Sequence, residues 1–176
     1  MQLRQIITKG LLLIIVGLFV SCTSQKVAYT PDIQNTYGFS EERLQSIQFY
    51  TSEDITLFIN KSNQATRIAN GKVIIDASNV EDAIFIPRNT PCVLVKKINS
   101  NILVVSFESG QGKQISFVNN GNTYSIGAKD WVDNQGVLKY GNKNYFTISK
   151  EAFLMIKVRK LNHIIRSQRT IRGRRL

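Results

Sequence analysis

Cysteine and histidine are scarce in this chain of 176 residues, which contains two cysteines and one histidine. A structural or catalytic zinc site needs three or four cysteine, histidine or carboxylate ligands, and Cys22, Cys92 and His163 do not form such a set. A serine–histidine–aspartate triad would have to use His163, and no G-x-S-x-G motif surrounds any serine. The sequence therefore predicts no metal site, no bound cofactor and no catalytic residue.

The neighbours of these residues predict where they lie. Cys92 belongs to the apolar run Pro91–Val95, and free cysteines in such runs are usually buried and inert. His163 lies among basic side chains and is expected at the solvent edge. The chain has one tryptophan, Trp131, in a turn-rich segment, where a binding spot and a lid over the core are both open interpretations.

Acidic residues are also few, with 12 Asp and Glu against 23 Lys and Arg. The excess of positive charge is concentrated at the C-terminus. Residues 157–176 contain no acid and eight basic side chains, which are Lys157, Arg159, Lys160, Arg166, Arg169, Arg172, Arg174 and Arg175. Guanidinium groups pair with carboxylates and phosphates, so Arg166, Arg169, Arg172, Arg174 and Arg175 are candidates for contact with an anionic partner. The alternative is a solvated edge whose charges prevent edge-to-edge strand pairing.

A long hydrophobic run is missing, since the longest apolar stretch, Leu11–Val20, has ten residues. A transmembrane helix needs about 20 residues, whereas a signal-peptide core fits this length and the preceding Arg4 and Lys9. The run ends in Phe19-Val20-Ser21-Cys22, which resembles the lipobox of bacterial lipoproteins. Phe19 departs from the leucine that is commoner at this place. An ordinary secretory signal is the alternative, although no A-x-A-like cleavage site follows the run.

The resemblance implies that signal peptidase II removes residues 1–21 and that Cys22 becomes the acylated first residue. Cys92 would then have no intramolecular disulfide partner. The polar segment Thr23–Thr30 leads us to expect a tether over residues 22–36. The first acid after Cys22 is Asp32, which favours the periplasm-facing leaflet of the outer membrane over the cell surface.

The remaining chain reads as short apolar runs of 4–8 residues separated by turn signals such as Asn99-Ser100-Asn101 and Gly141-Asn142-Lys143-Asn144. This pattern predicts an all-β fold, a single antiparallel sandwich or small barrel, over residues 37–160. One helical turn is expected at Ser40–Leu44, because Ser40 can cap it.

Residues 161–176 admit three interpretations. Leu161, Ile164, Ile165 and Gln168 have helical spacing, whereas alternation with arginines and the β-branched Thr170 and Ile171 favour a strand. A disordered arm is the third option. We expect a basic strand that ends near Thr170–Ile171, with a frayed tail.

Together these features predict a lipid-anchored, non-enzymatic envelope lipoprotein that binds or braces another envelope component. Its partners would be the membrane, through the lipid on Cys22, and an envelope protein or anionic polymer. Export excludes nucleic acid as a target. Two alternatives remain open: a hydrolase of envelope polymers, with carboxylates assembled by the fold, and a carrier of small apolar ligands.

Overall fold

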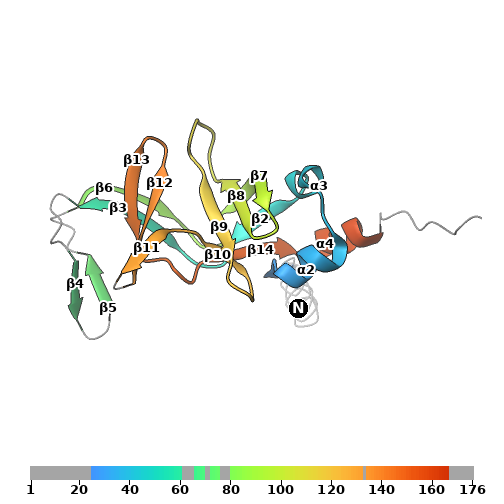
Figure 1. Ribbon diagram of the computed structural model, residues 1–176, viewed down its shortest axis with the longest axis horizontal. Helices are drawn as coiled ribbons and strands as arrows, with labels where there is room; N and C mark the ends of the chain where they lie inside the picture. Colours follow the sequence, from blue (N-terminus) through green and yellow to red (C-terminus); the bar gives the residue numbers. More distant parts are fainter. Residues whose placement is uncertain (1–24, 61–65, 70–71, 76–79, 133, 167–176) are drawn as a thin grey trace, which may run out of the picture.

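The computed structural model describes residues 25–60, 66–69, 72–75, 80–132 and 134–166 (Figure 1). The predicted signal peptide, residues 1–21, and Cys22 lie outside these residues, as do Arg169, Arg172, Arg174 and Arg175. In the part of the chain that is described, no helix has both the length and the apolar character needed to span a bilayer.

The larger sheet is antiparallel, and its strand order is β1-β14-β2-β7-β8-β9-β10. Both ends of the chain contribute to it, because β1 pairs with β14 across most of the sequence. Its strands are β1 Lys26–Ala28, β2 Gln48–Thr51, β7 Pro91–Asn99, β8 Ile102–Ser106, β9 Ile115–Asn119, β10 Tyr124–Ile126 and β14 Leu154–Lys157.

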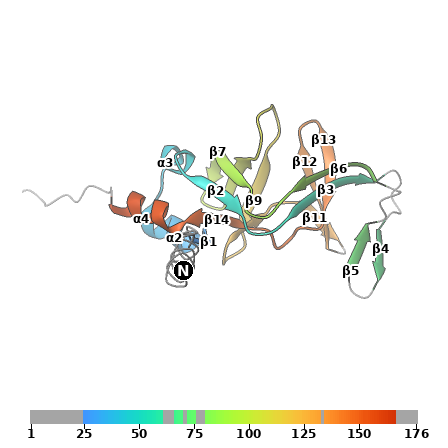
Figure 2. The ribbon, with the colours of Figure 1, turned by 180° about the vertical axis from the view of Figure 1, so that it is seen from behind.

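The second sheet has the order β11-β12-β13-β3-β6, and a separate hairpin joins β4 to β5. The strands of the second sheet are β3 Ile55–Asn60, β6 Val80–Ile86, β11 Lys129–Val132, β12 Gln135–Tyr140 and β13 Lys143–Thr147. The hairpin strands are β4 Thr66–Ala69 and β5 Lys72–Ile75, at the end of the molecule opposite α4 (Figure 2).

The predicted all-β fold is confirmed, and the described strands form two open antiparallel sheets rather than a closed barrel. Two predicted turns also join paired strands, since Ser100 and Asn101 connect β7 to β8, and Gly141 and Asn142 connect β12 to β13. Inward-facing side chains alternate with exposed ones along strands such as β7, as expected where one face of a sheet is buried.

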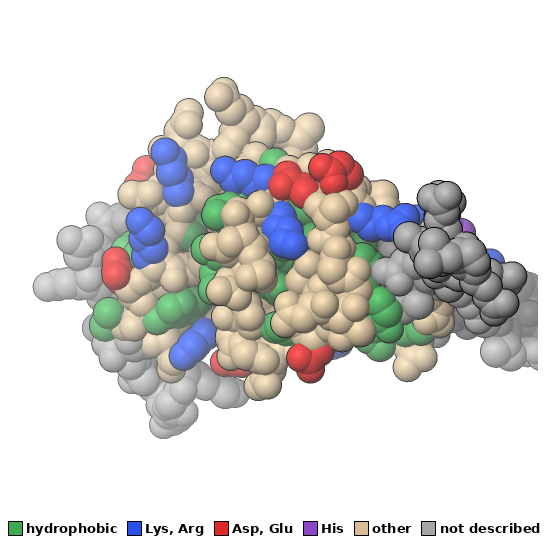
Figure 3. Space-filling model, turned by 45° about the vertical axis from the view of Figure 1, so that its right-hand side comes forward, with side chains coloured by type: hydrophobic (Ala, Val, Ile, Leu, Met, Phe, Trp, Pro, Cys, Tyr) green, Lys and Arg blue, Asp and Glu red, His purple; other side chains and the backbone are tan. Residues whose placement is uncertain are grey.

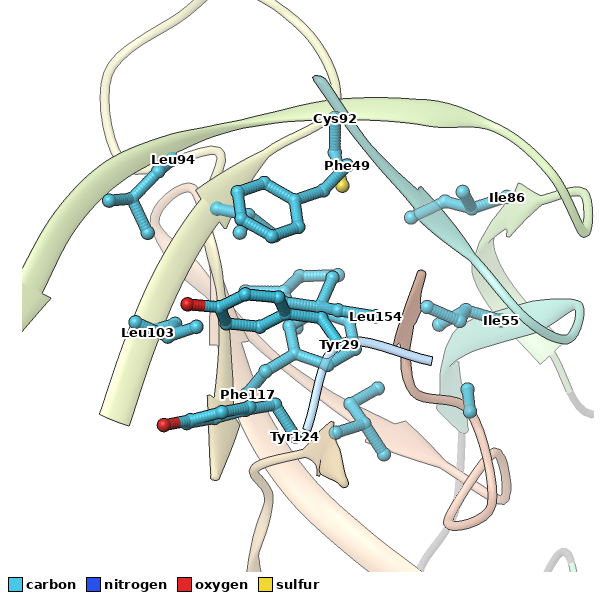
Figure 4. Packing of buried hydrophobic residues seen from close by; sticks show 14 of the residues in the cluster. Tyr29, Phe49, Ile55, Ile86, Cys92, Leu94, Leu103, Phe117, Tyr124 and Leu154 are labelled. Carbon is cyan, nitrogen blue, oxygen red and sulfur yellow. The ribbon is translucent and has the colours of Figure 1, made fainter. Parts of the chain in front are cut away.

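A shared core lies between the two sheets. Phe49, Leu103 and Phe117 from the large sheet and Ile55 and Ile86 from the second sheet belong to one buried cluster (Figure 4). Burial of such side chains stabilises the fold by about 1.5–3 kcal/mol each. The core therefore holds the two sheets together.

The N-terminal segment corrects the predicted tether, because the domain begins well before residue 37. Lys26–Ala28 form β1, and Tyr29 is completely buried. The Tyr29 ring stacks on Tyr124 and meets the edge of Phe49, while its hydroxyl donates a 2.5 Å hydrogen bond to Gln34 Oε1 (Figure 4). A tether over residues 22–36 is therefore wrong for at least the residues from Lys26 onward.

Helix α2, Pro31–Tyr37, was not predicted, although its local signals are present. Thr30 caps it by accepting a hydrogen bond from Ile33 N, Pro31 occupies its first turn, and Gly38 ends it with a φ of 52°. A left-handed residue at this place is commonly glycine. Helix α3, Glu41–Gln45, confirms the predicted helical turn, and Ser40 caps it through Arg43 N.

The predicted C-terminal strand is wrong for residues 161–166, because helix α4 spans Val158–Arg166. The ladder with β1 ends at the pair Lys26 and Lys157, and only one further backbone hydrogen bond, from Val158 N to Gln25 O, joins the two segments. Backbone groups without a sheet partner need other hydrogen bonds, and a helix supplies them internally. Leu161 is 9% exposed, whereas Asn162 and His163 face solvent.

Candidate functional site: the basic end of the sheet

The start of the described chain is fixed to the start of α4. Val158 N donates a 3.0 Å hydrogen bond to Gln25 O, and Tyr29 N donates a 2.8 Å bond to Leu154 O. Between them, β1 and β14 pair from Lys26 with Lys157 to Ala28 with Met155. Gln25 therefore lies beside the start of α4, and Figure 2 shows β1 at the same end of the molecule as this helix.

Two lysines from the paired strands meet above one aromatic ring at this end. Lys26 Nζ lies 4.2 Å and Lys157 Nζ 5.4 Å from the centroid of the Tyr50 ring. The Lys26 ammonium also donates a 2.9 Å hydrogen bond to Asn89 Oδ1. Because the negative face of an aromatic ring attracts cations, Tyr50 allows two positive charges to be held close together.

Helix α4 extends this positive surface. Lys157, Arg159, Lys160 and His163 line a hollow of about 350 Å³, and the three helical side chains among them are exposed. His163 follows Lys160 by three residues and Arg159 by four, a spacing that places them on one side of a helix. We call Lys26, Lys157, Arg159, Lys160 and His163 the basic end.

The predicted site residues stand in different positions relative to the basic end. Cys22 precedes Gln25 by three residues in the sequence, and Arg166 is the last residue of α4. The Arg166 side chain, Arg169, Arg172, Arg174 and Arg175 lie outside the described part, so their contact with a partner stays a prediction. The expectation that His163 lies at the solvent edge is confirmed. Sequence reasoning counted Lys157, Arg159 and Lys160 as part of the basic stretch but missed Lys26, because its place depends on the pairing of β1 with β14.

Cys92 is a free thiol with 2% of its surface exposed, as predicted. Burial raises its pKa well above the ordinary value for a thiol, because desolvation disfavours the thiolate. The thiolate is the reactive form of cysteine. Cys92 is therefore a core residue without the environment of a nucleophile.

Two tyrosine–carboxylate–lysine groups include the buried tyrosines Tyr140 and Tyr145 of the second sheet. Tyr140 donates a 2.7 Å hydrogen bond to Glu108, which also pairs with Lys113 at 3.1 Å. In the second group, Tyr145 donates a 2.9 Å hydrogen bond to Asp82, whose other partner is Lys143 at 3.1 Å. The tyrosine rings meet edge to face with centroids 6.3 Å apart. We call these six residues the hairpin cluster, since it surrounds the β12–β13 hairpin.

Both carboxyl groups of the hairpin cluster have pKa values below their ordinary range. The hydrogen bond from Tyr140, followed by that from Lys113, lowers the pKa of Glu108. The hydrogen bonds from Tyr145 and Lys143 do the same for Asp82. Donors to a carboxylate stabilise its charged form, so both groups are ionised at neutral pH and neither is poised to donate a proton.

Removing one tyrosine hydroxyl is expected to raise the pKa of one carboxyl group only. Tyr140→Phe should raise the pKa of Glu108 and leave that of Asp82 unchanged. Tyr145→Phe should raise the pKa of Asp82 and leave that of Glu108 unchanged. NMR titration of the side-chain carboxyl carbons measures both values in each variant. Equal titration curves for Glu108 in the wild type and Tyr140→Phe would contradict this.

The same shifts predict how stability depends on pH. Ordinary pKa values are 3.8 for an aspartate and 4.5 for a glutamate, and folding lowers both. The stabilisation is therefore complete above these values and is lost as the pH falls through the lower values of the folded state. Urea midpoints should fall less steeply on acidification in Tyr140→Phe than in the wild type.

A second hollow of about 490 Å³ lies between β9 and the β11–β12 pair. Gln114, Lys129, Asp130, Lys139 and Asn144 give it a mixed polar lining. Across the described residues, no group of three or more Cys, His, Asp or Glu is placed to hold a metal ion. Because its lining carries charges of both signs, this hollow does not indicate one class of ligand.

Trp131 belongs to β11 and packs against the shared core. A Cβ atom added at Gly136 would lie 2.9 Å from the Trp131 ring, so the ring depends on a glycine beneath it. Of the two interpretations of this tryptophan, its position agrees with a lid over the core.

On one face of the molecule, the charged side chains are mixed in sign. Figure 3 shows Lys and Arg interspersed with Asp and Glu over the face it presents. The two ion pairs seen among the described residues, Lys113 with Glu108 and Lys143 with Asp82, both belong to the hairpin cluster. The basic end differs from these regions because no described carboxylate forms an ion pair with any of its members.

Comparisons with known proteins do not supply a function. No family model, no curated protein and no solved structure matches this chain. The function has to be argued from the residues of the chain itself.

Proposed function

We propose that this chain is an exported, lipid-anchored envelope protein without enzymatic activity, which binds or braces another envelope component. Cys22 carries the anchor, on the basis of the lipobox resemblance of Phe19-Val20-Ser21-Cys22. The observation that carries the proposal furthest is the short distance in sequence between Cys22 and the sheet. Gln25 already bonds to Val158, and β1 begins at Lys26.

This short connection limits how far the body can stand from its anchor. An extended chain spans at most about 3.6 Å per residue, so the three steps from Cys22 to Gln25 cover about 11 Å. A lipid on Cys22 would therefore hold the α4 end of the molecule at the membrane surface. The protein is a body pressed to the bilayer rather than a domain on a long stalk.

The two carboxyl groups of the hairpin cluster support a non-enzymatic role. Hydrolysis of a glycosidic polymer uses two carboxyl groups across a cleft, one of them protonated. Asp82 and Glu108 have lowered pKa values, and each is engaged by a tyrosine and a lysine. Their hydrogen bonds tie distant strands together, which is a structural role. The buried Cys92 thiol is equally unsuited to nucleophilic attack.

The C-terminal arginines are proposed to contact the anionic component. Truncation after Ile165 removes Arg166, Arg169, Arg172, Arg174 and Arg175 and should abolish salt-sensitive recovery of the partner after cross-linking in cells. The five Arg→Gln replacements should do the same, while five Arg→Lys replacements, which keep the charge, should retain most of it. Unchanged recovery with the truncated chain would remove these arginines from the proposal.

A further inference from the structure

We infer that the basic end is a docking surface for the phosphate groups of anionic lipids in the bilayer that holds Cys22. This inference rests on the proposed function, because the lipid anchor brings the surface to the membrane. It assigns a binding role to Lys26, Lys157, Arg159, Lys160 and His163. The role adds to the anchor and does not involve the C-terminal arginines.

The first support is the unpaired charge of this surface. Lys113 and Lys143 of the hairpin cluster are neutralised by carboxylates at 3.1 Å. In the described part of the chain, no carboxylate forms an ion pair with Lys26, Lys157, Arg159, Lys160 or His163. Cations that are not neutralised by a carboxylate remain available to an external anion.

The second support is that part of the surface is held in place before any anion binds. The Tyr50 ring and Asn89 restrain the Lys26 and Lys157 ammonium groups. Side chains that are already ordered lose less entropy on binding. Lys157 also lines the hollow beside Arg159, Lys160 and His163, so the restrained pair and the helical group form one continuous surface.

The third support is position. Lys26 is four residues from Cys22 in the sequence, and Lys157 is its direct partner across the sheet. An acylated Cys22 would thus place both lysines within reach of the headgroups without a further conformational change. Each Lys or Arg close to an anionic membrane strengthens binding about five-fold.

The experiment uses the mature chain, residues 22–176, with Cys22→Ser so that no acyl chain contributes. This chain keeps every described residue. Sedimentation with vesicles of phosphatidylglycerol and phosphatidylethanolamine should show binding that weakens with salt, and vesicles of phosphatidylcholine should show almost none. Arg159→Gln combined with Lys160→Gln should weaken binding to the anionic vesicles about 25-fold.

The matched control is Lys129→Gln combined with Lys139→Gln, which removes the same charge from two exposed lysines of the second sheet. It should change binding less than two-fold. A second test pair, Lys26→Gln with Lys157→Gln, covers the case in which the α4 variant fails to fold, as judged by circular dichroism. Inorganic phosphate alone is titrated in parallel to identify a site for free phosphate.

Three outcomes would overturn the inference. They are equal binding by the test and control variants, equal binding to anionic and phosphatidylcholine vesicles, and saturable binding of inorganic phosphate without any binding to vesicles. None of them depends on acylation, because the chain used has none. Failure of the lipid anchor would appear instead in labelling of the native protein, so the two proposals fail separately.

Discussion

Cys22→Ala is expected to abolish incorporation of labelled fatty acid into this protein in cells. The lipobox resemblance assigns Cys22 as the acylated residue, and alanine offers no thiol for the thioether bond. Each buried CH₂ group contributes about 0.8 kcal/mol to membrane attachment, so loss of the chains removes the main source of durable anchoring. Metabolic labelling followed by immunoprecipitation measures the incorporated fatty acid directly. The measurement holds even if the Cys22→Ala variant keeps its signal peptide.

Cys92→Ala is the matched control for this experiment. It removes the other thiol of the chain, which is buried and has a raised pKa, and it should leave the label unchanged. Equal label in the wild type and in Cys22→Ala would end the lipoprotein proposal. Loss of label in Cys92→Ala, with label retained in Cys22→Ala, would show that Cys92 and not Cys22 is the acylated residue.

Tyr29→Ala is expected to lower the free energy of unfolding by about 3–5 kcal/mol, the usual cost of deleting a buried aromatic side chain. Tyr29 has no exposed surface, and its ring centroid lies 5.2 Å from that of Phe49 and 5.5 Å from that of Tyr124. Its hydroxyl also satisfies the buried Gln34 side chain. Urea denaturation of the mature chain, residues 22–176 with Cys22→Ser, measures the loss.

Phe85→Ala provides the comparison, because it deletes an aromatic ring that is 61% exposed on β6. Its cost should be about 1 kcal/mol or less. Tyr29→Phe should fall between the two, since the ring remains but the Gln34 amide loses a partner, at about 1–3 kcal/mol. If Tyr29→Ala is as mild as Phe85→Ala, residues 22–36 behave as a tether after all.

The N-terminal boundary shows what sequence patterns can and cannot reveal. Strand β1 has three residues, and its existence depends on a partner 131 positions later, with Lys26 opposite Lys157. No local pattern encodes such a pairing. Helix α2 differs, because Thr30, Pro31 and Gly38 are recognisable start and stop signals that could have been used.

The strands in the middle of the chain were predictable because they pair with strands that are close in the sequence. Their turns, such as Gly141–Asn142, join strands that are neighbours in sequence, so alternation and turn residues suffice to place them. The C-terminal segment carried both a strand pattern and a helical one. The β1 ladder ends at Lys157 and the helix begins at Val158, a boundary in the assembled sheet that neither local pattern marks.

The candidate site was predictable only in part. The basic composition of residues 157–176 is visible in the sequence. The contact of Lys26 and Lys157 with Tyr50, in contrast, joins three strands that are far apart in the sequence. The hairpin cluster is similar, since Tyr145 and Asp82 are 63 residues apart. Such contacts follow from topology, which single-sequence patterns do not determine.

The most direct test of the anchor is mass spectrometry of the N-terminal tryptic peptide of the protein isolated from its own membranes. We expect a peptide that begins at Cys22, ends at Lys26 and carries the mass of two or three acyl chains. A peptide that begins elsewhere, or one that contains Cys22 as an unmodified thiol, would contradict a body held to the bilayer by this residue.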